Sequence, residues 1–82
     1  MVHLKYEGRS ETIEFDVLFP TERYASIGIA AGTTATPQTV SEQQIRLALA
    51  QHFDVGLDEF EEHFIEINPN GNITVRPEAV FG

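Results

Sequence analysis

A single helix signal in the middle of the chain constrains the fold more than any other feature. Ser41 is an N-cap candidate, and Gln44 follows at the spacing of a capping box. Val40 and Ile45 occupy the two hydrophobic-staple positions around this cap. The positions that follow share one helical stripe: Ile45, Ala48, Leu49, His52 and Phe53. The pattern predicts a helix over residues 42–53, about three turns long.

Alternating segments before this helix predict a β-hairpin. Residues 2–7 alternate between apolar and polar side chains, and residues 12–19 do the same after a short Gly-containing turn at 8–10. Pro20 cannot donate a hydrogen bond to a strand ladder, so the second strand is expected to stop there.

Residues 20–40 carry a weaker signal. Ala25, Ile27 and Ile29 alternate with small or polar side chains, which is compatible with a short third strand. Residues 30–39 are small and hydroxyl-rich, as in a loop. The stretch 31–34 lacks the lysine and the spaced glycines of a phosphate-binding loop, so we interpret it as a connection.

A second, shorter helix is expected after the first. Asp54-Val55-Gly56 is expected to end the long helix, with Gly56 a plausible stop. Asp58 is a cap candidate for a new helix that runs to His63. Leu57, Phe60 and Phe64 share one face of it at spacings of three and four.

The last part of the chain predicts a second hairpin. Residues 65–67 and 73–75 flank an Asn-Pro-Asn-Gly turn, and Asn-Gly favours positive φ. Pro77 is expected to end the final strand.

The element order favours an α+β fold of the β-grasp type. Hairpin, helix, short helix and hairpin give a four-stranded mixed sheet covered by one main helix. The crossover is right-handed when the first and last strands lie parallel in the middle. We expect a β-grasp domain at 1–77 and a flexible C-terminal tail at 78–82. A two-layer sandwich with another strand order stays open. The predicted core comprises Leu4, Ile13, Phe15, Val17, Ile45, Leu49, Phe53, Phe60, Ile67, Ile73 and Val75.

Composition limits the classes of function. A chain of 82 residues holds one domain, and the absence of cysteine excludes disulfides and thiol chemistry. Five basic residues against thirteen acidic ones give a net charge of −8, which disfavours binding to nucleic acids and anionic membrane surfaces. No apolar run approaches the roughly 20 residues of a membrane span, and residues 1–5 lack a signal peptide's apolar stretch. We therefore expect a cytoplasmic protein.

No residue pattern predicts catalysis. His3, His52 and His63 do not pair at a metal-ligand spacing. His52 is expected at the edge of the core, and His63 near a helix end that favours a cation. The acidic stretch 58–62 lacks the arrangement of a calcium loop, so we interpret it as a solvated helix face. We expect a non-enzyme with no metal site and no cofactor.

The C-terminal glycine is the residue with the clearest chemical use. The chain ends in Arg76-Pro77-Glu78-Ala79-Val80-Phe81-Gly82. A terminal carboxylate activated by ATP becomes an acyl-adenylate and then a thioester. Because glycine has no Cβ, its carbonyl can enter a narrow channel and approach a thiol.

This ending and the element order together resemble ubiquitin-like proteins that end in a single glycine. Residues 73–82, a strand, a proline and a short tail, look like the ubiquitin-fold modifier, and Phe81-Gly82 is similar to the ending of mature autophagy-type ubiquitin-like proteins. The chain differs from ubiquitin itself because Phe81 replaces the first glycine of the terminal pair. Its 20–40 segment is also longer.

The resemblance implies a protein modifier that is joined to target amines by an isopeptide bond through Gly82. Its implied partners are an E1-like activating enzyme, an E2-like conjugating enzyme, a deconjugating protease and the target proteins. Val80 and Phe81 would form a partner-binding tail. Lys5 would be the side-chain route for linking copies into chains. The alternatives are a non-catalytic protein–protein interaction module of the same fold, and a sulfur carrier protein.

Overall fold

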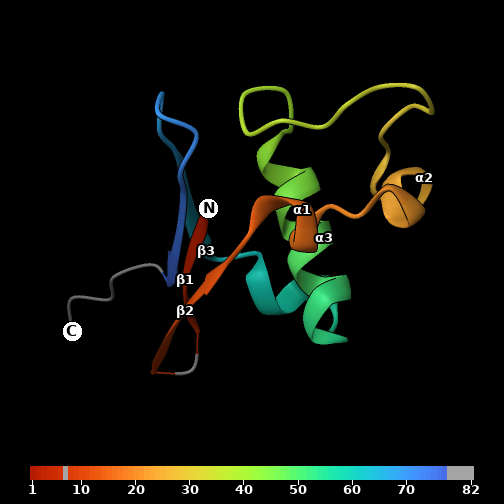
Figure 1. The fold of residues 1–82 in the computed structure, drawn as a ribbon. Helices are drawn as coiled ribbons and strands as arrows, with labels where there is room; N and C mark the ends of the chain where they lie inside the picture. The colour runs from red at the N-terminus through yellow and green to blue at the C-terminus, as the bar shows by residue number, and fades with distance from the viewer. Residues whose placement is uncertain (7, 78–82) are drawn as a thin grey trace.

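Residues 1–6 and 8–77 are described by the structure, a computed structural model of the chain. Figure 1 shows two layers, with the sheet on one side and the helices on the other. Two 3₁₀ turns, η1 (Thr21–Arg23) and η2 (Leu57–Phe60), join the longer elements. Those elements are β1 (Val2–Tyr6), β2 (Arg9–Ile13), α1 (Phe15–Leu18), α2 (Tyr24–Ile27), α3 (Glu42–Phe53), β3 (His63–Ile67) and β4 (Ile73–Pro77).

The sheet has four strands in the order β2-β1-β4-β3. β1 and β4 are parallel neighbours in the middle, and each outer strand is antiparallel to the strand beside it. The register places Val2 opposite both Ile13 and Ile73, so one face of the sheet presents a continuous apolar row. This confirms the predicted α+β class, the four-stranded mixed sheet and the central parallel pair.

The long helix α3 has the predicted bounds and the predicted cap. The Gln44 backbone N–H donates to Ser41 Oγ at 3.1 Å, and the Ser41 N–H donates to Gln44 Oε1 at 2.9 Å. These two bonds satisfy donors that a helix start leaves unpaired. The expected stop at Gly56 is wrong. Asp54 takes the left-handed conformation that ends the helix (φ 55°), and Gly56 instead precedes η2.

The second predicted strand is wrong at both ends, because β2 already begins at Arg9, inside the turn expected at 8–10, and it ends at Ile13. Phe15–Leu18 form the helical turn α1, in which Leu18 is fully buried and Val17 is 53% exposed. Helical spacing brings Phe15 and Phe19 to the same side, where their rings stack with centroids 4.7 Å apart. The apolar residues at 15, 18 and 19 fit the helical period as well as those at 15, 17 and 19 fit the alternation of a strand. The burial of Leu18 favours the helical turn.

The third predicted strand is also wrong, because residues 21–27 form η1 and α2. The Ile29 N–H donates to the Tyr24 carbonyl at 2.8 Å, which closes the turn locally and leaves no ladder to extend. Gly28 adopts φ 90° and supplies the left-handed residue that this closure requires. Tyr24 Oη accepts a bond from the Ala35 N–H, so it anchors the following loop. Residues 30–39 form no helix or strand, as expected.

The short second helix is smaller than predicted. It is one 3₁₀ turn that begins at Leu57, with Gly56 rather than Asp58 at the cap position. His63 and Phe64 already belong to β3, so Phe64 does not share the buried face of Phe60. The second hairpin is confirmed, and β4 ends at Pro77 as expected.

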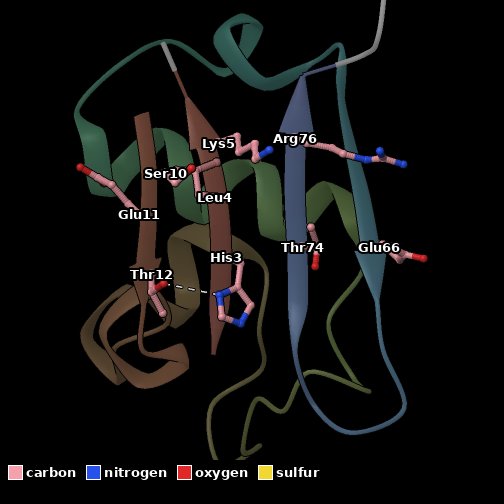
Figure 2. A pocket seen from close by; sticks show the side chains of 9 residues that line it. All are labelled: His3, Leu4, Lys5, Ser10, Glu11, Thr12, Glu66, Thr74 and Arg76. Carbon is pink, nitrogen blue, oxygen red and sulfur yellow. Dashed lines mark hydrogen bonds between the residues drawn. The ribbon is translucent and has the colours of Figure 1, made fainter. Parts of the chain in front are cut away.

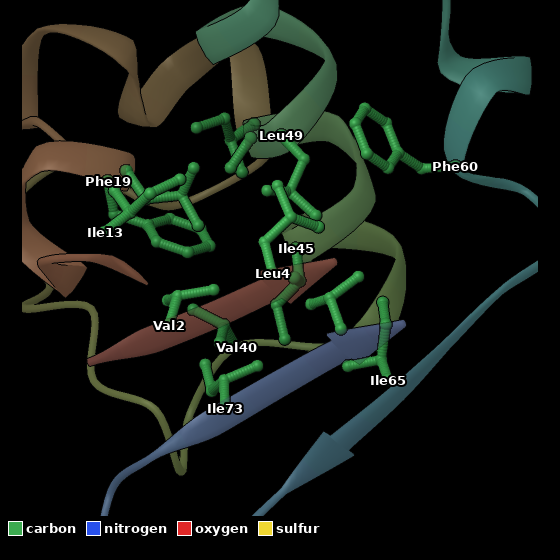
Figure 3. Close-up of a cluster of buried hydrophobic side chains, with 14 of the residues drawn as sticks. Val2, Leu4, Ile13, Phe19, Val40, Ile45, Leu49, Phe60, Ile65 and Ile73 are labelled. Carbon is green, nitrogen blue, oxygen red and sulfur yellow. The ribbon is translucent and has the colours of Figure 1, made fainter. Parts of the chain in front are cut away.

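The core lies between the sheet and α3 (Figure 3). Phe15, Phe53 and Ile67 are half-buried at its margin, and Val17 is an incorrect prediction. The other seven predicted core residues are buried. The prediction omitted these buried residues: Val2, Leu18, Phe19, Ile27, Ile29, Ala35, Val40, Ala48, Ala50 and Ile65. In residues 1–6 and 8–77, no helix has the length and apolar character needed to cross a membrane.

Candidate functional site

One face of the sheet covers the core, and within residues 1–6 and 8–77 no helix lies on the other face (Figure 1). Alternate residues of all four strands point to this second side, since neighbouring side chains of a strand project in opposite directions. We call these residues the outer face: His3, Lys5, Ser10, Thr12, Phe64, Glu66, Thr74 and Arg76. The paired strands align them in two rows, one through His3 and one through Lys5.

A shallow hollow of about 350 Å³ lies on the outer face. Lys5 and Arg76 line this hollow from β1 and β4, the two central strands of the sheet (Figure 2). Ser10, Thr12 and Thr74 contribute hydroxyl groups to its lining. Thr12 Oγ1 lies 3.4 Å from His3 Nδ1. The volume is at the lower end of the range for ligand sites, roughly 300–1,000 Å³.

The outer face is richer in cations than the chain as a whole. The outer-face residues include Lys5, Arg76 and His3 and one carboxylate, that of Glu66, while Glu11 also lines the hollow. Within the described residues the one salt bridge joins Arg46 to Glu42 in α3, with the charged atoms 3.7 Å apart. The Arg76 guanidinium instead lies 5.6 Å from the centre of the Phe64 ring, a cation–π contact.

Phe64 is the most exposed large apolar side chain of the outer face, at 59%. It sits opposite Arg76 in the antiparallel β3–β4 pair. A partner that buries the Phe64 side chain would gain hydrophobic binding free energy, because the ring is exposed to water in the chain alone.

The predicted tail residues Val80, Phe81 and Gly82 lie outside the described residues, so their expected roles stay predictions. β4 leads to them from the centre of the sheet and ends at Pro77. Covalent geometry limits five residues to a reach of at most about 18 Å from that point. Lys5 is exposed on the side of β1 opposite Leu4, as predicted.

The three histidines lie in different places. His3 belongs to the outer face, and His52 is half-buried beside Phe53, with ring centroids 4.9 Å apart. His63 is in β3, so its predicted position at a helix end is wrong. The side chains of Asp58, Glu59, Glu61 and Glu62 are exposed. Among the residues that the structure describes, no group of three or more potential ligands could hold a metal ion.

Arg46 connects α3 to the segment that carries His63. Its Nε donates to the Phe60 carbonyl and its Nη2 to the His63 carbonyl, both at 3.1 Å. The His63 Nε2 atom is buried and has no hydrogen-bond partner among residues 1–6 and 8–77. Burial of the ring lowers the pKa of His63, the nearby Arg46 charge lowers it further, and Glu59 opposes them. A proton on this ring would therefore be unfavourable in the folded protein.

This arrangement predicts a pH-dependent stability. The pKa of His63 in the folded protein lies below its ordinary value of 6.5. As the pH falls below the ordinary value, the unfolded chain binds a proton that the folded protein does not, so the free energy of unfolding decreases until the pH passes the folded pKa. His63→Phe should remove this decrease between about pH 7.5 and 5.5, as measured by urea denaturation.

His3→Gln is the matched control for this measurement, because it removes a histidine from the exposed outer face. It should keep the wild-type decrease in stability. The same pH dependence in His63→Phe as in the wild-type protein would contradict the assignment to His63.

Part of this site was readable from the sequence. The alternation of the first strand placed Lys5 and His3 on the polar side. Phe64 and Arg76 were missed as a pair. The inward positions of Ile65 and Val75 were a sufficient signal for the direction of both side chains, because the residues next to them must then point outward.

Comparisons with protein-family models, curated proteins and solved structures found no match to the chain.

Proposed function

We propose that the chain is a β-grasp protein of the ubiquitin-like type that is joined to target amines through Gly82. The strand order β2-β1-β4-β3, with a parallel central pair and one helix across a single face, is the observation that supports this most. β4 also directs the chain from the centre of the sheet toward residues 78–82.

The proposed chemistry takes place at the terminal carboxylate. It attacks the α-phosphate of ATP in the active site of an E1-like enzyme, which gives an acyl-adenylate and releases pyrophosphate. A cysteine thiolate then displaces AMP to form a thioester. The acyl group passes to an E2-like enzyme and finally to an amine of a target protein, and each transfer releases the previous thiol. The chain itself is non-catalytic, and Val80 and Phe81 supply apolar contacts to the enzymes and to a deconjugating protease.

Incubation with E1-like enzymes and ATP, followed by mass spectrometry of the C-terminus, tests the activation step. The proposal predicts an adenylate on Gly82, or a thioester to the enzyme that a reducing agent cleaves. Reactions without ATP are the control. An unmodified Gly82 carboxylate with every such enzyme would count against activation.

A second candidate is a non-catalytic interaction module that uses the outer face. The exposure of Phe64 beside Arg76 favours it, since a free apolar ring next to a cation suits a protein contact. This function does not require Gly82, so a variant without that residue separates the two candidates.

If copies of the protein are joined to one another, the linkage has few routes. Lys5 is the single lysine of the sequence, and the other amine is that of Met1, which donates a 3.4 Å hydrogen bond to Asn72 Oδ1. Lys5→Arg keeps the positive charge and should remove side-chain-linked polymers while single attachment to targets continues. Gel analysis of conjugates checks this. Polymers that persist in a Lys5→Arg protein with a blocked N-terminus would contradict it.

A further inference from the structure

We propose that the outer face binds a carboxylate-rich segment of a protein partner, with Lys5 and Arg76 as the principal contacts. This inference deepens the second candidate function, because it names the chemistry of the partner. It does not depend on conjugation through Gly82.

The charge distribution carries the argument. Thirteen acidic residues give the chain its net charge of −8, yet Glu66 is the one carboxylate among the outer-face residues, and Glu11 adds one more at the edge of the hollow. Two of the five Lys and Arg residues lie there. Leu4 pairs with Val75 on the parallel central strands, so Lys5 and Arg76, which follow them, emerge side by side and line the same hollow. Neither forms a salt bridge within the described part of the chain.

The neighbouring side chains suit carboxylates. Ser10, Thr12 and Thr74 line the same hollow as Lys5 and Arg76, and each hydroxyl can donate one hydrogen bond to an oxygen anion. Arg76 presents a planar fork that can bind a carboxylate with two parallel bonds. Its contact with the Phe64 ring restricts the guanidinium, so less side-chain entropy is lost when the anion binds.

The same charge distribution limits the size of the partner's acidic region. A nucleic acid or an anionic membrane extends beyond the outer face and meets the repulsion of the remaining carboxylates. A short peptide segment confines its charge to the hollow, because interactions beyond about 8–10 Å are largely screened at physiological salt. An apolar residue beside the acids would gain a contact with Phe64. The favoured occupant is therefore an extended acidic peptide with an apolar residue among its carboxylates.

Nuclear magnetic resonance titration of the full chain tests this proposal. The probe is a capped peptide, Glu-Ser-Glu-Ser-Leu-Ser-Glu-Ser, whose alternation places its carboxylates and its leucine on one side of an extended chain. The matched peptide has glutamine at each glutamate. We expect backbone amide shifts confined to the four strands with the acidic peptide, none with the glutamine peptide, and weaker binding as salt is raised.

Charge-reversal variants locate the contact. Lys5→Glu with Arg76→Glu should weaken binding at least tenfold, and Phe64→Ala should weaken it less. Arg9→Glu with Arg23→Glu changes the net charge equally at residues outside the outer face, so it should keep most of the affinity. All of these side chains except the partly buried Arg23 are exposed, and dispersed amide spectra verify that each variant is folded.

Three results would overturn the inference: no shifts at millimolar acidic peptide, equal binding of the glutamine peptide, or equal losses in the two double variants. A protein without Gly82 should give the wild-type titration. Failure of the titration in a protein that is still conjugated would therefore reject the acidic-segment inference and leave the modifier proposal standing.

Discussion

Deletion of Gly82 is expected to abolish covalent attachment to targets and to leave the folded domain unchanged. Activation requires the terminal carboxylate on a residue without a Cβ, and deletion presents Phe81 to the enzyme instead. The buried residues that the structure describes lie between Val2 and Val75. Denaturing gels of tagged wild-type and deleted protein, expressed alike, measure the loss as disappearance of higher-mass species.

Two milder variants refine the same prediction. Gly82→Ala should impair transfer strongly, because a methyl group at the reacting carbon hinders the approach of the thiol. Phe81→Ala keeps the reacting group and should weaken enzyme binding, by about 1.5–3 kcal/mol when the ring is fully buried in the complex. Equal conjugation of the wild-type and Gly82-deleted proteins would reject the modifier function and favour the interaction module.

Leu49→Ala is expected to produce the largest loss of stability among the changes that we consider. The Leu49 side chain is fully buried between α3 and the sheet (Figure 3), and truncation leaves a cavity there. The free energy of unfolding should fall by roughly 2–5 kcal/mol. Urea denaturation followed by circular dichroism measures this as a lower midpoint.

Val17→Ala is the matched control, because the alternation in the sequence places both residues in the core. In the structure Val17 is 53% exposed, so its truncation should change stability by less than about 0.5 kcal/mol. A large loss in Val17→Ala would show that residues 15–19 continue the strand. An unchanged midpoint in Leu49→Ala would contradict the packing of α3 on the sheet.

The elements that could be predicted are those whose signals are local and agree with one another. Ser41 and Gln44 satisfy each other's backbone donors, so the start of α3 is encoded within four residues. The Asn-Gly turn likewise specifies the second hairpin. Once both hairpins and the helix are placed, the handedness of the crossover leaves few strand orders, which is why the central parallel pair was predictable.

The errors arise where two periods fit the same residues. Phe15, Val17 and Phe19 alternate like a strand, yet Leu18 and Phe19 are the buried pair once the chain turns into α1. The spacing of the apolar residues cannot distinguish a strand from a helical turn here, because the outcome depends on how residues 15–19 are buried against α3 and the loop that precedes it. Phe64 presents the same ambiguity. It fits a helical face with Phe60 and also the outward side of β3, and pairing with β4 determines the outcome.

The candidate site was predictable in its exposed parts and not in its packing. Lys5 lies on the polar side of an unmistakable alternation. The outward direction of Arg76 and Phe64 follows from the alternation in β3 and β4, whereas their contact depends on the register that places them opposite each other. The burial of the His63 ring depends on how Arg46 spans from α3 to η2 and β3, a long-range contact without a sequence signal.

The most direct test of the modifier proposal is a search for its covalent remnant on other proteins. The tagged protein is purified under denaturing conditions and digested with a protease that cleaves after glutamate. Cleavage after Glu78 leaves Ala79-Val80-Phe81-Gly82 on each modified amine. The account predicts lysine side chains of foreign proteins that carry this four-residue addition through an amide to Gly82. Recovery of the C-terminal peptide only with a free Gly82 carboxylate would contradict it.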